Sequence, residues 1–145
     1  MKISTKGRYA LRMMVELGTK AEGVYTSLKD ISKSQDISVK YLEQITSMLS
    51  KSGMIKSARG ANGGHMLSRR SDQYTLGEIL RVTEGSLSPV ACLEDKSNLC
   101  ERAGRCATLE FWEGFEKVIN DYVDSVTLAD LINKIKEKGS FEYII

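Results

Sequence analysis

Apolar residues recur at helical spacing in the first third of the chain, in segments that polar caps and turns separate. The first segment follows Ser4 or Thr5, either of which can cap a helix, and its pattern ends near Gly23. Its apolar positions follow the spacing i, i+3, i+4, i+7 and are Ala10, Met13, Met14 and Leu17. A shorter segment begins at Ser27, with Asp30 three residues later as in a capping box. Two helices are therefore expected before residue 35.

A third helix is predicted directly behind the second, after a tight turn at 35–37. Ser38 can cap this helix and Gly53 ends it. One face is expected to be buried and carries Leu42, Ile45 and Leu49. The opposite face exposes Lys40, Glu43, Gln44 and Ser47. Two helices joined by so short a turn are typical of a helix-turn-helix, whose second helix enters the major groove of DNA.

A basic β-hairpin is predicted next. Residues 54–59 alternate between apolar and polar as a strand does, and residues 65–68 form the returning strand. The turn between them, at 60–64, is rich in glycine and asparagine, which tolerate a positive φ. Such a hairpin behind a helix-turn-helix is a wing, and Arg59 beside its tip suits a narrow minor groove.

The second half of the chain contains three further predicted helices. Thr75 with Glu78 and Thr127 with Asp130 have the spacing of capping boxes and begin two of them. The longest helix runs from about 108 to 126. Its apolar stripe includes Leu109, Trp112, Phe115, Ile119, Tyr122 and Val126.

These elements predict a mainly α fold, a winged helix-turn-helix with a β-hairpin wing followed by a long C-terminal helix. We expect a DNA-binding domain over residues 1–84 and a cysteine-containing loop without periodicity over 85–107. Dimerisation helices and a tail are expected over 108–145.

The charge is divided unevenly along the chain. Residues 1–70 carry 13 Lys and Arg against 5 Asp and Glu, a net of +8, whereas residues 71–145 carry 8 against 14, a net of −6. This asymmetry favours a polyanion as the partner of the first half, although a solvated basic face has the same composition.

Other features exclude several classes of protein. No apolar run is long enough to span a membrane and the N-terminus has no secretory h-region, so a cytoplasmic location is expected. Three cysteines, an odd number, argue against a disulfide framework. The sequence has one histidine, no nucleophile motif and no phosphate-binding loop. These residues do not form a recognisable catalytic group, so an enzyme is not expected.

The exposed face of the third helix suits base recognition. Gln44 can bind adenine, Glu43 can accept from cytosine N4, and Lys40 can contact phosphate or guanine. A carboxylate that faces DNA lowers the affinity for DNA of any sequence. Glu43 therefore indicates discrimination between bases rather than nonspecific binding to DNA.

Three motifs strongly resemble the IscR-type (Rrf-two) family of regulators. They are Thr5-Lys6-Gly7-Arg8-Tyr9-Ala10, then Ile37-Ser38 with Tyr41-Leu42-Glu43-Gln44, then Arg59-Gly60 with Gly63-Gly64. The resemblance covers residues 1 to about 135. It implies a homodimeric winged-helix repressor or activator. The expected case is a repressor that binds a palindromic operator in double-stranded DNA. The DNA-binding residues that it implies are Ser38, Lys40, Tyr41, Glu43, Gln44, Arg59 and Gly60.

All three cysteines, Cys92, Cys100 and Cys106, fall within fifteen residues of the irregular loop. Soft thiolate ligands suit iron–sulfur clusters and zinc, and the C-x2-C spacing of a zinc ribbon is absent. In the iron–sulfur members of the family, three cysteines at this place hold a [2Fe-2S] or [4Fe-4S] cluster. The resemblance therefore implies an iron–sulfur cofactor, with the nuclearity left open.

At the position of a fourth cluster ligand, this sequence departs from the family pattern. Some members use a histidine three residues after the last cysteine, and that position here is Leu109. Glu110 beside it is a weak candidate, and His65 belongs to the wing.

The aromatic stripe of the long helix is wider than one small domain needs. The resemblance implies that this helix forms the dimer interface, and Trp112, Phe115, Ile119 and Tyr122 are the residues expected there. A second copy of the helix would then bury the surplus apolar surface.

Three alternatives to cluster control stay open. One is a thiol switch in which two cysteines form a disulfide on oxidation. Another is a cluster-free repressor of cysteine metabolism that acts through a partner enzyme, a branch whose tail the C-terminal residues 141–145 resemble although its members lack the three cysteines. The third is a zinc-stabilised interaction module.

Overall fold

The computed structural model describes residues 1–139, and the tail at 141–145 lies outside the described residues. The elements are α1 (Thr5–Gly18), α2 (Leu28–Gln35), α3 (Val39–Lys51), β1 (Ile55–Ala58), β2 (Gly64–Leu67), η1 (Ser71–Gln73), α4 (Leu76–Glu84), η2 (Ala91–Leu93), η3 (Ala103–Arg105), α5 (Leu109–Ser125) and α6 (Leu128–Glu137). This order confirms the predicted winged-helix fold, mainly helical with one two-stranded hairpin. No helix within residues 1–139 is long and apolar enough to cross a bilayer.

Side-chain caps begin the helices where the sequence predicts. The hydroxyls of Ser4, Ser27 and Ser38 accept hydrogen bonds from backbone N–H groups three residues later. Thr75 and Thr127 form complete capping boxes with Glu78 and Asp130. Because each cap satisfies N–H groups that the helix itself leaves without partners, these starts are determined locally.

The end of α1 corrects the expectation of a helix reaching Gly23. The helix ends at Gly18, where the Thr19 N–H bonds back to the carbonyls of Val15 and Glu16. Residues 19–24 are all exposed, so a further helical turn would bury nothing.

The wing is an antiparallel hairpin in which Ile55 pairs with Leu67 and Ala58 with Gly64. The first strand is two residues shorter than predicted, and the second has the predicted length but begins and ends one residue earlier. Gly64 has a φ of +141°, and a Cβ at this position would overlap the backbone of Thr26. The bare backbone allows Thr26 and His65 to exchange N–H···O bonds of 2.8 Å in each direction, which tie the wing to the start of α2.

One hydrophobic core holds the body of the molecule together, and α1 lies at its centre. The core contains Ala10, Met13, Met14 and Leu17 from α1, Leu42, Ile45 and Leu49 from α3, and Leu128, Ile132 and Ile135 from α6. The last helix, grouped from sequence with the dimerisation segment at 108–145, therefore packs with the winged-helix half.

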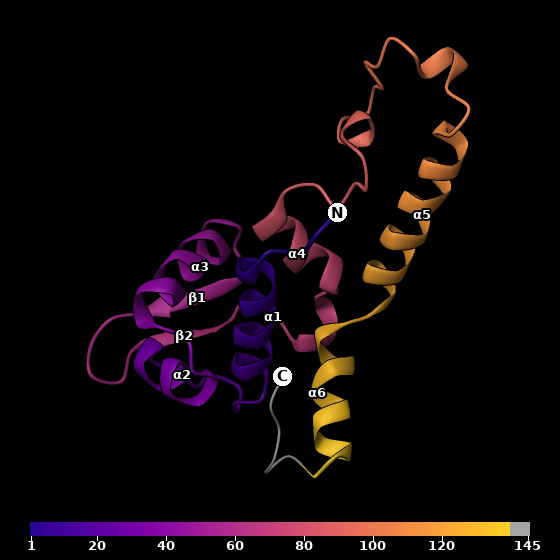
Figure 1. The fold of residues 1–145 in the computed structure, drawn as a ribbon. Coiled ribbons are helices and arrows are strands. Elements are labelled where there is room, and N and C mark those ends of the chain that lie inside the picture. The colour runs from indigo at the N-terminus through magenta and orange to yellow at the C-terminus, as the bar shows by residue number, and fades with distance from the viewer. Residues whose placement is uncertain (140–145) are drawn as a thin grey trace.

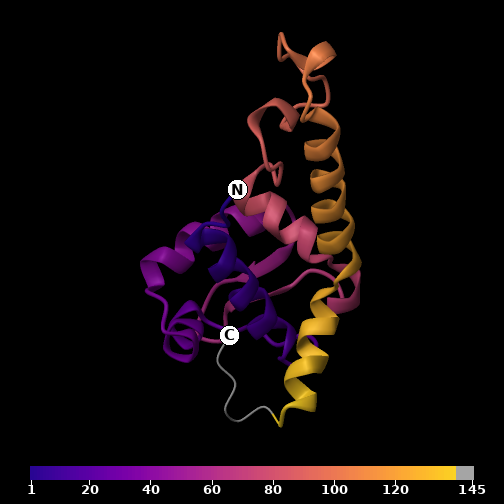
Figure 2. The same cartoon turned by 45° about the vertical axis from the view of Figure 1, so that its right-hand side comes forward.

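In contrast, α5 leaves the body as an arm, with the cysteine-containing segment beyond its N-terminal end (Figures 1 and 2). None of its residues is fully buried. Its base is held by Arg81 of α4, which forks onto the Asp124 carboxylate at 2.7 and 3.0 Å and also donates to Asn120 at 2.8 Å. This pair lowers the pKa of the Asp124 carboxyl, chiefly through the hydrogen bonds from Arg81.

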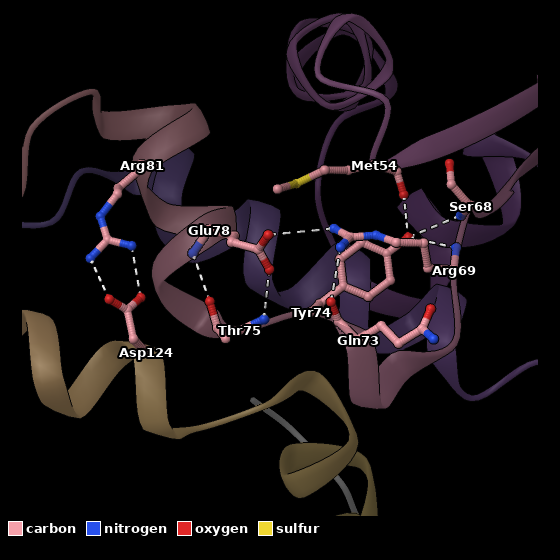
Figure 3. A network of polar contacts seen from close by, with 9 residues as sticks. All are labelled: Met54, Ser68, Arg69, Gln73, Tyr74, Thr75, Glu78, Arg81 and Asp124. Atoms are coloured by element: carbon pink, nitrogen blue, oxygen red, sulfur yellow. Dashed lines mark hydrogen bonds and ion pairs between the residues drawn. The ribbon is translucent and has the colours of Figure 1, made fainter.

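Tyr74 joins the wing to the last helix, and Figure 3 shows its hydrogen bonds on the side of the wing. Its side chain is completely buried, and the hydroxyl donates to the Met54 carbonyl at 2.6 Å. The same oxygen accepts from the N–H groups of Ser68 and Arg69, each at 3.0 Å. The Tyr74 carbonyl accepts from the Leu128 N–H at 3.0 Å, where α6 begins. One buried residue thus satisfies backbone groups on both sides of the wing and at the root of α6.

Replacing Tyr74 with Phe removes the hydroxyl and leaves three backbone groups without that partner. We expect the free energy of unfolding to fall by about 2–4 kcal/mol, since a buried polar group left unpaired costs roughly 1–3 kcal/mol. Urea denaturation followed by circular dichroism measures this change. Tyr25→Phe is the matched control, because Tyr25 is only half-buried and lies outside the hydrophobic core of the described residues. Equal stability of the two variants would contradict the role given to Tyr74.

Candidate nucleic-acid interface and cysteine loop

The outer face of α3 carries a row of exposed polar side chains. Lys40, Glu43 and Gln44 project from its first two turns. Ser38 is also exposed, and its side chain caps the start of the helix. Tyr41 is half-buried and packs edge-on against Tyr9 of α1, with ring centroids 5.4 Å apart. The structure therefore gathers the residues expected from sequence on one helix face and uses Tyr41 to fix that face against α1.

A polar network between α1 and α2 sets the turn that leads into α3. Arg12 donates from Nε to the side-chain oxygen of Gln35 at 3.2 Å and from Nη2 to the Gln35 carbonyl. The Gln35 amide in turn donates to Glu16 at 2.8 Å. Asp36 ends α2 with a φ of +53°, and the Ser32 hydroxyl donates to the Ile37 carbonyl at 2.5 Å. The turn is thus held by side chains of both neighbouring helices.

Sequence reasoning about direct DNA contacts omitted Lys6. The structure places this residue of α1 beside the exposed α3 face, where both helices line one open hollow. The lining residues are Lys6, Lys40, Glu43, Gln44, Ser47 and Met48. The available signal was the position of Lys6 in the first turn of α1, within the Thr5-Lys6-Gly7-Arg8 motif.

Arg59 lies directly after β1, exposed at the turn of the wing, and Gly60 follows it with a φ of +101°. His65 sits on β2, where Ser57 bonds its Nδ1 at 2.8 Å, and partial burial lowers the pKa of its imidazole. Burial therefore favours the neutral form of the imidazole, and the bond to Ser57 makes His65 part of the wing.

The three cysteines share one segment but are not drawn together. Cys92 is half-buried, Cys100 and Cys106 are exposed, and all three are free thiols. No three His, Cys, Asp or Glu side chains among residues 1–139 lie close enough to hold a metal ion. The donor atoms fit an iron–sulfur cluster in kind, whereas their present spacing requires the loop to rearrange. Glu110 is exposed on the first turn of α5, next to the half-buried Leu109.

Cys106 has the most distinctive surroundings of the three thiols. The hydroxyl and N–H of Thr108 lower the pKa of the Cys106 thiol, with help from the Leu109 N–H and from the charge of Arg102. Its sulfur lies 3.5 Å from the Thr108 hydroxyl. A thiol at a helix N-terminus forms its thiolate more readily, and the thiolate is the form that binds metals and reacts with oxidants.

The exposed apolar stripe of α5 differs in part from the one expected. Phe115 and Tyr122 are exposed, as a dimer contact requires, whereas Trp112 and Ile119 are half-buried within the chain. The other exposed members are Phe111 and Val118, so that the stripe consists of Phe111, Phe115, Val118 and Tyr122 at 64%, 42%, 65% and 68% exposure.

Comparison with known proteins shows that the chain is similar to one family of regulators. A family model described as "Rrf2: Iron-dependent Transcriptional regulator" matches residues 3–134. The chain is 46% identical to the HTH-type transcriptional regulator CymR of Bacillus subtilis over 131 residues, covering 90% of this chain and 89% of that protein. It is 33% identical to the HTH-type transcriptional regulator IscR of Erwinia tasmaniensis over 133 residues, covering 92% and 79%.

Solved structures agree with these matches. The B. subtilis CymR structure, described as that of the global cysteine regulator, superposes with a TM-score of 0.76 at 42% identity, covering 92% of this chain and 98% of that one. The structure of T. potens IscR gives 0.76 at 36% identity, covering 95% and 90%. These relatives are named as regulators of transcription, in keeping with the expectation of a chain that is not an enzyme. The chain belongs to the Rrf2 family and is a winged-helix, DNA-binding transcriptional regulator.

Proposed function

We propose that this protein is a homodimeric repressor that reads a palindromic operator with α3 and the wing, and that its cysteine loop controls this binding. The observation that carries the DNA-binding geometry is the exposed row of Lys40, Glu43 and Gln44 on α3, in a half of the chain with a net charge of +8. Gln44 and Glu43 suit base edges, and Lys40 suits phosphate or guanine. Ser38 and Tyr41, beside them at the helix start, suit the DNA backbone.

The wing supplies a second contact. Arg59 carries its charge at the turn, and Gly60 lets the backbone approach the DNA closely. An arginine in a narrow minor groove gains from the enhanced negative potential there. We therefore assign Arg59 to the minor groove that flanks the α3 site.

Replacing Arg59 with Ala tests the wing contact. Operator binding should weaken by about 1–3 kcal/mol, and wild-type affinity should fall steeply with salt because counterions are released from the DNA. Fluorescence anisotropy on a duplex selected from a random library by the wild-type protein measures both effects. Lys136→Ala, which removes an exposed positive charge from α6, should bind as the wild type does. Wild-type affinity that is indifferent to salt contradicts DNA binding by this face.

The dimer is proposed to form through the exposed stripe of α5. A two-fold interface repeats each contact, so four large apolar side chains per protomer become eight. Full burial of each contributes roughly 1.5–3 kcal/mol before the entropy of association is subtracted. The interface would also space two α3 helices about one turn of DNA apart, roughly 34 Å, as a palindrome requires.

Val118→Glu tests this interface. The substitution places two unpaired carboxylates in a symmetric apolar contact, a cost of several kcal/mol, so sedimentation should show monomers at micromolar concentration. Affinity for the full palindrome should fall with the loss of the dimer. Val24→Glu changes another exposed valine, 46% accessible and away from α5, and should remain dimeric. A folded Val118→Glu dimer would move the interface elsewhere.

For the cysteine loop we propose an iron–sulfur cluster held by Cys92, Cys100 and Cys106. The proposal is supported by three free thiols within fifteen residues, by the iron-dependent description of the family, and by relatives named IscR. When bound, the cluster would supply a redox- and iron-sensitive centre. The chain's own part is to provide the thiolates, most readily from Cys106, and to order the 85–107 segment around them.

A cluster-free regulator of cysteine metabolism is the second candidate. It is favoured by the 46% identity to CymR and by the separation of the three thiols. In that case control comes from a partner enzyme or from oxidation of thiols. The hydrogen bonds from Thr108 lower the pKa of Cys106, which makes it the thiol expected to react first.

Anaerobic reconstitution with iron and sulfide separates the two candidates. A cluster gives a coloured protein that contains iron and acid-labile sulfide, and each single Cys→Ala change should remove most of the colour. Glu110→Ala should leave the spectrum unchanged unless Glu110 is the fourth ligand. Protein that stays colourless after reconstitution excludes the cluster, and labelling of Cys106 ahead of Cys92 and Cys100 by a thiol reagent would then support a thiol switch.

A further inference from the structure

The first turn of α1 is clamped to the end of α4 by a single carboxylate. Glu84, the last residue of α4, accepts two hydrogen bonds at Oε1 from Ser4, one from the backbone N–H at 3.0 Å and one from the hydroxyl at 2.6 Å. The Ser4 hydroxyl in turn accepts from the Gly7 N–H at 3.3 Å, which caps the helix. The cap of α1 therefore depends on an acceptor supplied from eighty residues away.

Gly7 makes this close approach possible. A Cβ at position 7 would overlap the Glu84 carboxylate and would lie 3.1 Å from the Ile3 side chain. Any larger residue would push Glu84 away from Ser4. The glycine here serves contact between helices rather than an unusual φ, since it lies within regular helix.

Lys6 lies inside the clamped turn, between Ser4 and Gly7 in the chain. It is half-buried and lines the same hollow as Lys40, Glu43 and Gln44 of α3. Among residues 1–139 no carboxylate forms an ion pair with it. A lysine without an acidic partner, at the edge of a helix face that enters the major groove, is placed for the phosphates that border the groove.

We infer that Lys6 is a phosphate contact of the DNA interface, and that Glu84 is the positioning residue that holds it there through Ser4. This inference rests on the proposed binding of DNA by α3. Glu84 does not touch DNA in this scheme. Its two hydrogen bonds fix the turn from which Lys6 reaches the backbone.

Whether removal of the Glu84 carboxylate strengthens or weakens DNA binding shows if Glu84 acts by positioning Lys6 or only by its charge. Removing a carboxylate close to DNA should by charge alone tighten binding. Loss of the clamp should instead weaken it. Glu84→Gln removes the same charge but keeps an amide oxygen that can accept both bonds from Ser4, so it is the matched control for Glu84→Ala.

The experiment measures the affinity of the full-length protein over a range of salt concentrations, on a duplex selected by the wild type and on a random duplex. Lys6→Ala should lower affinity roughly tenfold on both duplexes, the size of one charge-assisted hydrogen bond. The slope of log K against log salt should fall by about one for each lost phosphate contact. Lys20→Ala, two residues beyond the C-terminal end of α1 and paired with Glu16, should leave affinity and slope unchanged.

The Glu84 variants complete the test. Glu84→Ala should weaken binding in the wild-type background and have no further effect beside Lys6→Ala, whereas Glu84→Gln should bind at least as well as the wild type. Melting temperatures identify any variant that is simply unfolded, and Gly7→Ala provides a second way to displace the carboxylate. The inference is overturned if Lys6→Ala behaves as Lys20→Ala does, or if the effects of Lys6→Ala and Glu84→Ala add. A wild-type protein without salt-dependent binding would instead refute the proposed function itself.

Discussion

The arrangement of the whole molecule depends on the buried hydroxyl and backbone of Tyr74. The hydroxyl bonds the strand connections on both sides of the wing, and the carbonyl bonds the first N–H of α6. Arg69 covers the ring, with its guanidinium 4.3 Å from the centroid, and reaches Glu78 of the α4 capping box at 3.7 Å. The wing, α4 and α6 are therefore oriented by one set of contacts around a single side chain (Figure 3).

The short helix α4, which begins beside Tyr74, contacts and positions both α5 and α1. Its start is capped beside Tyr74, its middle holds α5 through Arg81 and Asp124, and its last residue, Glu84, holds the first turn of α1. The α1 helix and the exposed arm thus meet the same short helix. The cysteine loop runs from the end of α4 to the N-terminal end of α5, so a change of loop structure acts first on Glu84 and on the end of α5 that lies away from its base.

In the proposed control of DNA binding, a ligand of the cysteine loop shifts the populations of two loop arrangements. The thiols are separated in the structure described here, and a ligand that requires them together stabilises another arrangement of residues 85–107. The free-energy difference between the arrangements has to be small for such a ligand to shift them. An exposed loop with short helical turns and few buried side chains meets that condition.

Sequence alone determined the order of elements, because caps, helical periodicity and the glycine-rich turn are local and depend on residues a few positions apart. It also located the exposed row of α3 and the three cysteines. The clamp of Glu84 on Ser4, the hydrogen bonds of Tyr74 to Met54 and Leu128, and the place of α6 in the core join residues twenty to more than a hundred positions apart. No local pattern encodes such pairs. On α5, Trp112 and Ile119 are seven residues apart, and so are Phe111 and Val118, so both pairs fit the periodicity of a helix equally well. Only packing of the helix against the rest of the chain decides which of these two stripes is left exposed for a partner.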